Sequence, residues 1–333
     1  MWLDHRALTI IVGTALLLLV VFLLWLFYLN KQLDDIRRFP LDVDDRPARV
    51  PGDAVNILLL GADDPDGRGG LFEQLDSGEW EPGSFRSDAI MVLHLNADRS
   101  SAQLVSIPRD SYVPIEGHGR NKINAAFSFG GPSLMVDTVE RLTNLYIDHT
   151  IVIDFSHFVE MTETIGGVDV TIPHPINDRG RVWEAGPHHL EGEDALWYVR
   201  TRYGLPRGDF DRVQRHQNFL RAVLDKMVST SVLANPFRVT RLATDLSDLV
   251  AVDESLTSGR LRSLVLGSRG LRPSTMRFVT APYVGTGMVG EASVVNLDVP
   301  MVRSMFRAVA IDQFEVWYGD NQVEELPAAD DVS

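Results

Sequence analysis

The sequence contains no cysteine among its 333 residues. This absence excludes disulfides, thiolate zinc sites, iron–sulfur clusters and a cysteine nucleophile. A basic excess is missing as well, because 46 acidic residues outnumber 31 basic ones and give a net charge of −15. Nucleic-acid-binding proteins present a basic surface to the phosphates, so we predict no nucleic-acid partner.

Two common catalytic motifs are also absent. The sequence has no glycine-rich loop that ends in Lys-Ser or Lys-Thr, which argues against an ordinary P-loop enzyme. It has no Gly-x-Ser-x-Gly elbow either. With 45% hydrophobic and 23% charged residues, the chain nevertheless has the composition of a globular protein.

The most prominent feature that is present is a long apolar run near the N-terminus. Residues 7–29 contain no charged side chain, and Trp25 and Tyr28 stand near one end of the run. Roughly 20 apolar residues are enough for a helix to cross the hydrocarbon of a bilayer, and aromatic rings favour its interface. We predict a retained transmembrane helix over 7–29, after a short cytoplasmic segment, 1–6. The alternatives are a buried core helix and a cleaved signal peptide, whose small cleavage residues are replaced here by aromatic ones.

The charges that flank this run favour a cytoplasmic position for the rest of the chain. Arg6 precedes the run, whereas Lys31, Arg37 and Arg38 follow it. Basic residues next to a membrane span tend to stay in the cytoplasm. Long domains cross the membrane despite such a bias, so this count is weak evidence for orientation.

The remaining chain alternates between strand-like and helix-like segments. Residues 30–52 are polar and contain three prolines, which predicts a linker, and residues 319–333 predict an acidic flexible tail. The alternation between them predicts a single α/β domain over 53–318. Strands are expected at 55–61, 89–96, 102–107, 150–155 and 168–172, and helices at 156–165, at 211–228 and from 130–132 onward.

Arginines are concentrated in one short segment of this acidic chain. Arg200 and Arg202 alternate on an expected extended stretch and would point to the same side. Arg212 and Arg215 lie three residues apart near the start of a helix, where free amides favour phosphate. The segment therefore predicts a site for a multiply charged anion. The alternative is a set of salt bridges with neighbouring carboxylates such as Asp209 and Asp211.

Further charged residues stand at the ends of the expected strands. Asp63 follows the first strand, Arg86 and Asp88 enter the second, and Arg109 follows the third. Two carboxylates suit Mg²⁺, which takes its other ligands from water or phosphate. Each aspartate alone could instead cap a turn. His174 and the pair His188-His189 lack a second pair of ligands, so the sequence does not predict zinc.

These residues lie within ordered motifs that resemble the LytR–CpsA–Psr family of bacterial cell-envelope proteins. The motifs are Asn56–Asp63, Arg86–Met91, Ser106–Ser111, Gly117–Phe127, Gly130–Pro132, Ile165–Val168, Leu190–Leu196, Tyr198–Arg202 and Gly208–Arg215. The resemblance covers nearly the whole chain after the predicted linker. It implies a three-layer α-β-α domain with a central mixed sheet, preceded by one transmembrane helix.

The resemblance also implies an activity. The family is understood to transfer a glycopolymer from a polyprenyl-pyrophosphate carrier to peptidoglycan, leaving a phosphodiester link. Those substrates lie outside the cell, so a single-pass protein of the cell membrane with an extracytoplasmic domain is expected, against the local charge count. The alternatives are a non-catalytic binder of lipid pyrophosphate that regulates the envelope, and a polyprenyl-pyrophosphate hydrolase. The presence of both Asp63 and Asp88 favours chemistry, since a binder needs only arginines.

The roles of individual residues follow from the resemblance. Asp63 and Asp88 would hold Mg²⁺ or Mn²⁺, and Arg86, Asp88 and Arg109 would be catalytic. The pyrophosphate would be bound by Arg86, Arg109, Lys122, Arg200, Arg202, Arg212, Arg215 and His216. This chain departs from the family at His216, because a glutamine is common there and here it follows as Gln217. The loop between Asp63 and Arg86 is also long.

Overall fold

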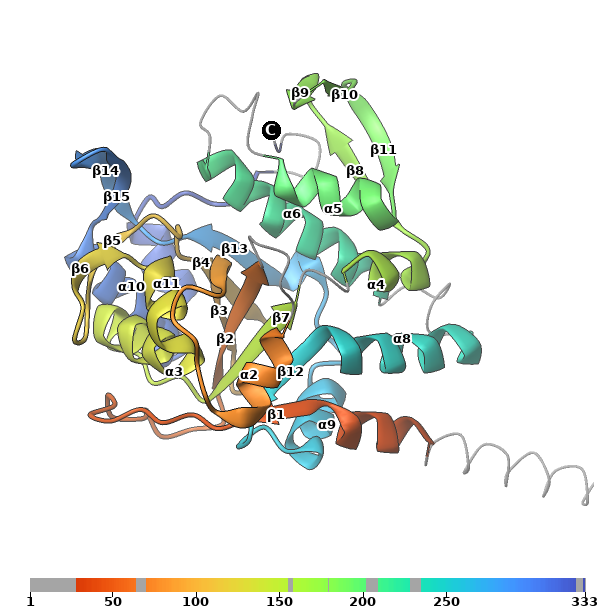
Figure 1. Cartoon of the computed structure of the whole chain (residues 1–333), viewed down its shortest axis with the longest axis horizontal. Coiled ribbons are helices and arrows are strands. Elements are labelled where there is room, and N and C mark those ends of the chain that lie inside the picture. Colours follow the sequence, from red (N-terminus) through yellow and green to blue (C-terminus); the bar gives the residue numbers. More distant parts are fainter. Residues whose placement is uncertain are drawn as a thin grey trace, which may run out of the picture.

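The centre of the molecule is a seven-stranded mixed sheet (Figure 1). The computed structural model describes residues 28–63, 70–154, 158–178, 180–201, 209–227, 235–327 and 332. Parallel pairs (β1–β12, β2–β7, β4–β13) and antiparallel pairs (β2–β3, β3–β4, β7–β12) both occur, which confirms the predicted mixed sheet. In spatial order the strands are β1 (Arg37–Phe39), β12 (Val250–Asp253), β7 (His149–Asp154), β2 (Val55–Asp63), β3 (Arg86–Leu95), β4 (Ala102–Ser106) and β13 (Met276–Thr280).

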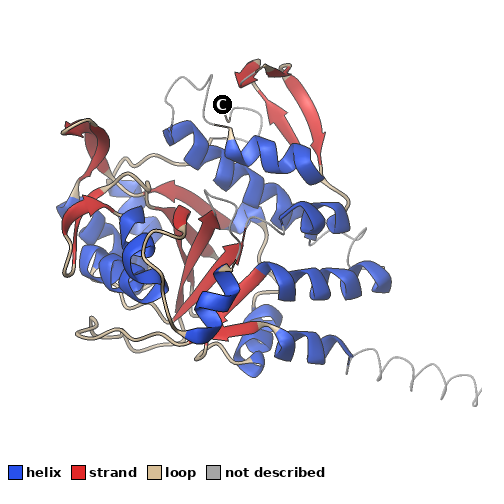
Figure 2. Cartoon of the chain, viewed as in Figure 1, coloured by secondary structure: helices blue, strands red, loops and turns tan. Residues whose placement is uncertain are grey.

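Both faces of this sheet are apolar. Alternate residues of a strand point to opposite sides, and in the central strands the residues on both sides are apolar. Leu58 and Leu60 of β2 are fully buried against helices on one face. Ile57 and Leu59 point to the other face, toward a second group of helices. Helices flank the strands on either side (Figure 2). The first group is α3 (Asn124–Thr143), α10 (Val299–Ala310) and α11 (Phe314–Asp320), and the second is α6 (Asp209–Met227) and α9 (Ser258–Gly267).

A smaller lobe packs beside the sheet and holds the helix that precedes α6. Its own core includes Ile165, Leu190 and Tyr198. This core fixes α5 against α6, which matters because charged side chains of both helices meet at the site below. The lobe consists of α4 (Phe158–Ile165), β8 (Val168–Ile172), β9 (Ile176–Asp178), β10 (Arg181–Trp183), β11 (Gly186–Leu190), α5 (Gly192–Arg200) and α8 (Pro236–Leu249).

The remaining elements are short and lie at the periphery. Hairpin β5–β6 contacts α3, and hairpin β14–β15 contacts β5. These contacts surround the loop that follows β4 and carries Arg109. Their bounds are α2 (Leu71–Ser77), β5 (Tyr112–Ile115), β6 (Gly119–Lys122), a 3₁₀ helix (Pro273–Thr275), β14 (Tyr283–Val289) and β15 (Ala292–Leu297).

The first part of the predicted linker belongs to the folded domain. Residues 28–35 are helical, and the next residues form β1 at the edge of the sheet. Leu33, Ile36 and Phe39 recur every three residues among charged neighbours, and Ile36 and Phe39 are buried. The sequence predicted a linker here because the many polar residues of the segment conceal the regular spacing of its three apolar residues.

The acidic tail also packs on the domain as far as the structure describes it. The amide of Leu326 donates to the carbonyl of Phe278 over 2.8 Å, and Leu326 itself is buried. Arg277 donates to the carboxylate of Glu325 over 2.7 Å, and the Tyr283 hydroxyl donates to that of Glu324 over 3.0 Å. The acids that suggested flexibility therefore have ordered partners.

Helix α3 begins earlier than the sequence predicts. It starts at Asn124 rather than near residue 130, and it is kinked at Gly130 and Gly131. Gly131 has a φ of 62°, and a Cβ there would lie 2.8 Å from the ring of Trp80. The two glycines therefore mark a bend inside the helix, where Trp80 approaches the backbone.

Within the described residues, none of the helices has the length and apolar character that a membrane span requires. The predicted span over 7–29 lies outside the described residues except for Tyr28 and Leu29. The transmembrane helix therefore stays a prediction.

Candidate functional site

The site begins at the carboxyl end of β2, where an aspartate meets an arginine from the small lobe. Asp63 is the last residue of β2, and Arg200 is the last residue of α5. The Nη2 atom of Arg200 donates to Oδ1 of Asp63 over 2.9 Å. This ion pair brings together two predicted site residues that are 137 positions apart in the chain.

Asp88 binds two further arginines. The Nη1 atom of Arg109 donates to its Oδ1 over 2.5 Å, and Nη1 of Arg212 donates to its Oδ2 over 3.4 Å. Arg109 comes from the loop after β4 and Arg212 from the first turn of α6. Three segments that are far apart in sequence therefore converge on one carboxylate.

A β-bulge helps to aim Asp88. In the β2–β3 ladder Gly61 pairs with Ala89 and Ala62 pairs with Ser87, so Asp88 is skipped. A bulge leaves one residue outside the ladder and changes the direction of its side chain, which is why bulges are common beside active sites. The residue that the bulge leaves outside the ladder, Asp88, is the one that contacts Arg212 of α6.

The start of α6 buries an unusual amount of charge. The side chain of Arg212 is 2% exposed, and Asp211 and Arg215 are buried as well. The guanidinium of Arg215 lies over the ring of Tyr198 on α5, 5.3 Å from its centroid. Charged residues are rarely buried to this extent without partners, so the fold maintains this cluster against a desolvation cost.

Arg109 is held by the backbone of its own loop. The amide of Asn124 donates to the carbonyl of Arg109 over 3.2 Å, and the Ser111 hydroxyl donates to the carbonyl of Pro108 over 2.6 Å. These bonds tie the loop to the start of α3. The guanidinium of Arg109 therefore projects from a fixed backbone.

The other predicted pyrophosphate ligands lie in different surroundings. Arg86 is exposed at the start of β3, and Lys122 pairs with Asp110 over 2.9 Å. Arg202 lies outside the described residues. The structure thus pairs Arg200 with Asp63, and both Arg109 and Arg212 with Asp88. The assignment of these three arginines to pyrophosphate stays a prediction, as do those of Arg86, Lys122, Arg202 and Arg215.

His216 lies behind this cluster, at the wall of an apolar cavity. Its Nε2 atom lies 2.8 Å from the carbonyl oxygen of Val199, so this nitrogen donates in the neutral ring. Burial and, after it, the positive charge of Arg212 lower the pKa of His216 from its usual 6.5 to about 4. His216 is therefore neutral at pH 7, and its assignment as a pyrophosphate ligand stays a prediction.

The low pKa of His216 predicts a specific pH dependence of stability. Between pH 6.5 and 4 the unfolded chain binds a proton on this residue that the folded chain does not, so stability falls as the pH falls through this window. At pH 5 the loss is about 2 kcal/mol. We expect the His216→Gln variant to lose correspondingly less stability between pH 7.5 and pH 5. Urea unfolding of both proteins at the two pH values measures this difference, and equal losses would contradict the assignment.

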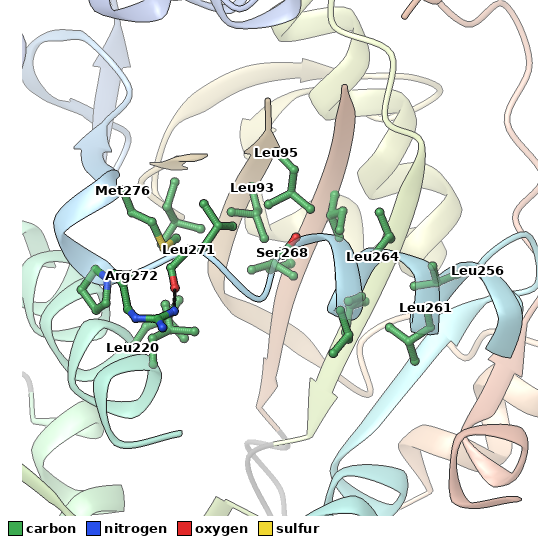
Figure 3. Close-up of a pocket in the computed structure, with 17 residues that line it drawn as sticks. Leu93, Leu95, Leu220, Leu256, Leu261, Leu264, Ser268, Leu271, Arg272 and Met276 are labelled. Carbon is green, nitrogen blue, oxygen red and sulfur yellow. Dashed lines mark hydrogen bonds between the residues drawn. The ribbon is translucent and has the colours of Figure 1, made fainter. Parts of the chain in front are cut away.

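Two neighbouring apolar cavities, together called the apolar channel, lie along the sheet next to the site. A cavity of 140 Å³ begins beside Gly61 and Ala89 and extends to Leu220 of α6. A second cavity of 320 Å³ shares Leu59 and Leu220 with the first and continues under α9. Its wall is almost entirely leucine, isoleucine, valine and methionine, as Figure 3 shows for the labelled residues. Charged groups at one end and an apolar interior suit a ligand with an anionic head and a long apolar tail.

The two carboxylates at the site suit a hard divalent cation. In the part of the chain that the structure describes, no group of three or more His, Cys, Asp or Glu side chains is placed to hold a metal. Mg²⁺ is commonly held by one or two carboxylates together with substrate phosphates, which matches Asp63 and Asp88. A cation there would compete with the arginines that now bind these carboxylates.

Sequence reasoning missed two partners in this site. Asp110 pairs with Lys122, and the ring of Tyr198 lies under the guanidinium of Arg215. Asp211, which is buried beside Arg212, was already named from the sequence as a possible partner of the arginines. The positions of Tyr198 and Asp110 depend on the packing of separate elements, for which the sequence carries no direct signal.

Comparisons with known proteins agree on one family. The model of the LytR_cpsA_psr family matches residues 32–309. The chain is 31% identical to "Cell wall biosynthesis protein LcpA" of Corynebacterium glutamicum, over 76% of this chain and 55% of that protein. It is 37% identical to "Polyisoprenyl-teichoic acid--peptidoglycan teichoic acid transferase TagU" of Bacillus mycoides, over 62% of this chain and 65% of that protein. The matched region thus spans about half to two thirds of these curated relatives.

A solved structure supports the same grouping. The crystal structure of TagV from B. subtilis superposes with a TM-score of 0.63 at 26% identity, and the match covers 79% of this chain and 99% of that one.

Proposed function

Because this chain belongs to the LytR–CpsA–Psr family, we propose that it transfers a glycopolymer from a polyprenyl-pyrophosphate carrier to peptidoglycan. One observation carries the proposal: the apolar channel begins at Gly61 and Ala89, within two residues of Asp63 and Asp88, whose carboxylates bind the arginines. A pyrophosphate at the cluster would place its prenyl chain in the channel. A soluble sugar phosphate would need only the charged cluster, and a simple lipid would need only the apolar channel.

The arginines supply the electrostatic part of the reaction. A hydroxyl of peptidoglycan attacks the phosphorus next to the glycan and loses its proton. The bond from that phosphorus to the bridging oxygen breaks, polyprenyl phosphate leaves, and a phosphodiester links glycan to peptidoglycan. Negative charge develops on the phosphate oxygens, and preorganised guanidinium groups such as those of Arg109, Arg200 and Arg212 stabilise it.

The two aspartates would hold the divalent cation. Mg²⁺ or Mn²⁺ bound by Asp63 and Asp88 would neutralise charge on the pyrophosphate. In the structure both carboxylates are bound by arginines. If Asp63 and Asp88 held the cation, these guanidinium groups would be available for phosphate oxygens. In the structure the two aspartates balance the positive charge of the arginines.

The proposed location is the outer side of the cell membrane, with the predicted N-terminal helix as anchor. Two of the three basic residues that favoured the cytoplasm are engaged in the fold. Arg37 pairs with Asp76 over 2.8 Å, and Arg38 binds the carbonyls of Leu33 and Ile36 over 3.1 and 2.9 Å. Charges that are compensated within a folded domain are a poor guide to orientation, which supports the extracytoplasmic proposal.

A single incubation tests the proposed activity against its alternatives. The detergent-solubilised full chain is mixed with lipid-linked glycan, peptidoglycan and Mg²⁺. A covalent glycan–peptidoglycan conjugate is the result expected of a transferase. Release of glycan phosphate into solution would identify a hydrolase, and retention of unreacted carrier on the protein would identify a binder. Either of the last two results would contradict the proposal.

Blocking the channel should weaken carrier binding without affecting the anion site. Leu220 lines both cavities, and a Leu220→Trp variant would fill part of the shared space. Each buried CH₂ contributes about 0.8 kcal/mol, so exclusion of one or two isoprene carbons lowers affinity roughly tenfold. Binding of inorganic pyrophosphate should stay unchanged. Titration calorimetry with both ligands measures the contrast, and Val316→Trp on exposed α11 is the matched control.

A further inference from the structure

Two helices extend from the same end of the sheet. Strand β1 is parallel to β12, and Arg37 pairs with Ala251 in their ladder. The helix of residues 28–35 directly precedes β1, and α8 directly precedes β12. Two helices that each lead into one of two parallel neighbouring strands have their N-terminal ends on the same side, and Figure 1 shows both running away from the sheet in one direction.

The outer end of α8 reaches further than the described end of the first helix. Tyr28 stands nine residues before Arg37, whereas Phe237 stands fourteen residues before Ala251. With a rise of 1.5 Å per helical residue, the five additional residues would carry Phe237 about 7 Å further from the sheet than Tyr28. If Tyr28 ends the predicted membrane span, Phe237 would then reach the depth of the lipid headgroups.

The outer turn of α8 has the composition of a membrane interface. Phe237 is 85% exposed, the largest value among the exposed large apolar side chains of the described residues. The side chain of Arg241, one turn further in, is 65% exposed. Aromatic rings favour the interface between water and hydrocarbon, and long basic side chains extend from it to lipid phosphates.

Both helices order their side chains in the same sequence from the outside inward. In the first helix Tyr28 is followed by Lys31 and then by Asp34 and Asp35. In α8 Phe237 is followed by Arg238 and Arg241 and then by Asp245 and Asp248. Aromatic, basic and acidic residues thus form three successive layers. This order matches a surface that is apolar first and negatively charged next, and it places the acids furthest from the lipid phosphates.

We propose that the N-terminal turn of α8 is a second contact between the domain and an anionic lipid bilayer, in addition to the predicted anchor. Phe237 inserts among the headgroups, and Arg238 and Arg241 bind lipid phosphates. The contact rests on the proposed membrane location. With two points of attachment the domain keeps one orientation over the bilayer instead of turning about a single helix.

The absence of cysteine allows a direct test. Single substitutions Phe237→Cys, Val284→Cys and Val316→Cys each give the full chain one thiol, and all three positions are exposed. Each variant is labelled with an environment-sensitive fluorophore and reconstituted into vesicles of phosphatidylglycerol and phosphatidylcholine. Lipids with a nitroxide near the headgroup quench only labels that enter the interface.

We expect quenching of at least about twofold for the label at position 237 and none at position 316. Val284 is an exposed apolar position on the hairpin β14–β15, and a quenched label there instead would assign membrane contact to that hairpin. Equal quenching at positions 237 and 316 would overturn the proposal. Adding Arg241→Glu to the Phe237→Cys variant should reduce quenching, and an unchanged value would also contradict it.

The design separates this proposal from those on which it rests. Flotation of the vesicles reports whether the chain is anchored at all, and a chain that stays behind removes the premise of the contact. Turnover in detergent, where no bilayer is present, reports the transferase activity independently. An anchored, active protein with an unquenched label at position 237 would refute the α8 contact alone.

Discussion

Replacing Asp88 by asparagine is expected to lower the transfer rate by about a thousandfold, the upper range for loss of one electrostatic element of an active site. The amide keeps the shape of the carboxylate, but its single oxygen can replace only one of the two acceptors that Arg109 and Arg212 now use. It lacks the charge that a divalent cation requires. The measurement is turnover of lipid-linked glycan at saturating Mg²⁺. We expect the carrier to remain bound, because the arginines persist.

The same variant should be less stable, since Arg109 and Arg212 lose their anionic partner. Inorganic pyrophosphate should restore part of the lost melting temperature by returning negative charge to the guanidinium groups. The control is Asp76→Asn, which alters the exposed pair of Asp76 with Arg37. Turnover by the Asp88→Asn variant at the wild-type rate in the presence of a chelator would rule out the metal-assisted mechanism.

The second large effect is expected from Arg109→Ala. This guanidinium binds Asp88 in the structure and projects from the fixed loop after β4, and we propose it as a phosphate ligand. Hydrogen bonds to charged groups contribute roughly 1.5–3 kcal/mol, so affinity for the carrier should fall about tenfold to a hundredfold. Titration calorimetry with lipid pyrophosphate measures the loss.

The control for this change is Arg37→Ala, because Arg37 also pairs with an aspartate but at a distant surface. Combining Arg109→Ala with Asp88→Asn completes a double-mutant cycle. If both residues act on one phosphate, the two effects are not additive. Unchanged carrier affinity in Arg109→Ala would remove this residue from the binding site.

The central strands were predictable because their apolar residues are contiguous and end in glycine or charged residues. Val55–Asp63 was expected over 55–61, and Val168–Ile172 was expected with the same bounds. The edge strand β1 was not predicted, because Phe39 is a single buried residue among charged neighbours and its pairing with β12 depends on a segment more than 200 residues later. Local patterns do not encode such distant pairing.

The candidate site was predictable in composition but not in geometry. The residue types at Asp63, Asp88, Arg109 and Arg212 pointed to anion and metal chemistry. The sequence did not indicate that each carboxylate is bound by an arginine, which requires the packing of α5 and α6 against the sheet. The sequence also did not indicate that the surroundings of His216 differ from those of the neighbouring arginines. Only the fold shows that the ring of His216 faces an apolar cavity.

The bulge at Asp88 makes the site depend on a count of residues as well as on their identity. If Ser87 were deleted, the ladder with β2 could close without a skipped position. A shift of one residue turns a strand side chain to the opposite face of its sheet. Every charged group would still be encoded, yet the carboxylate would no longer point toward α6. Deletion of this one residue would therefore turn the carboxylate of Asp88 away from the site while every charged residue of the site is kept.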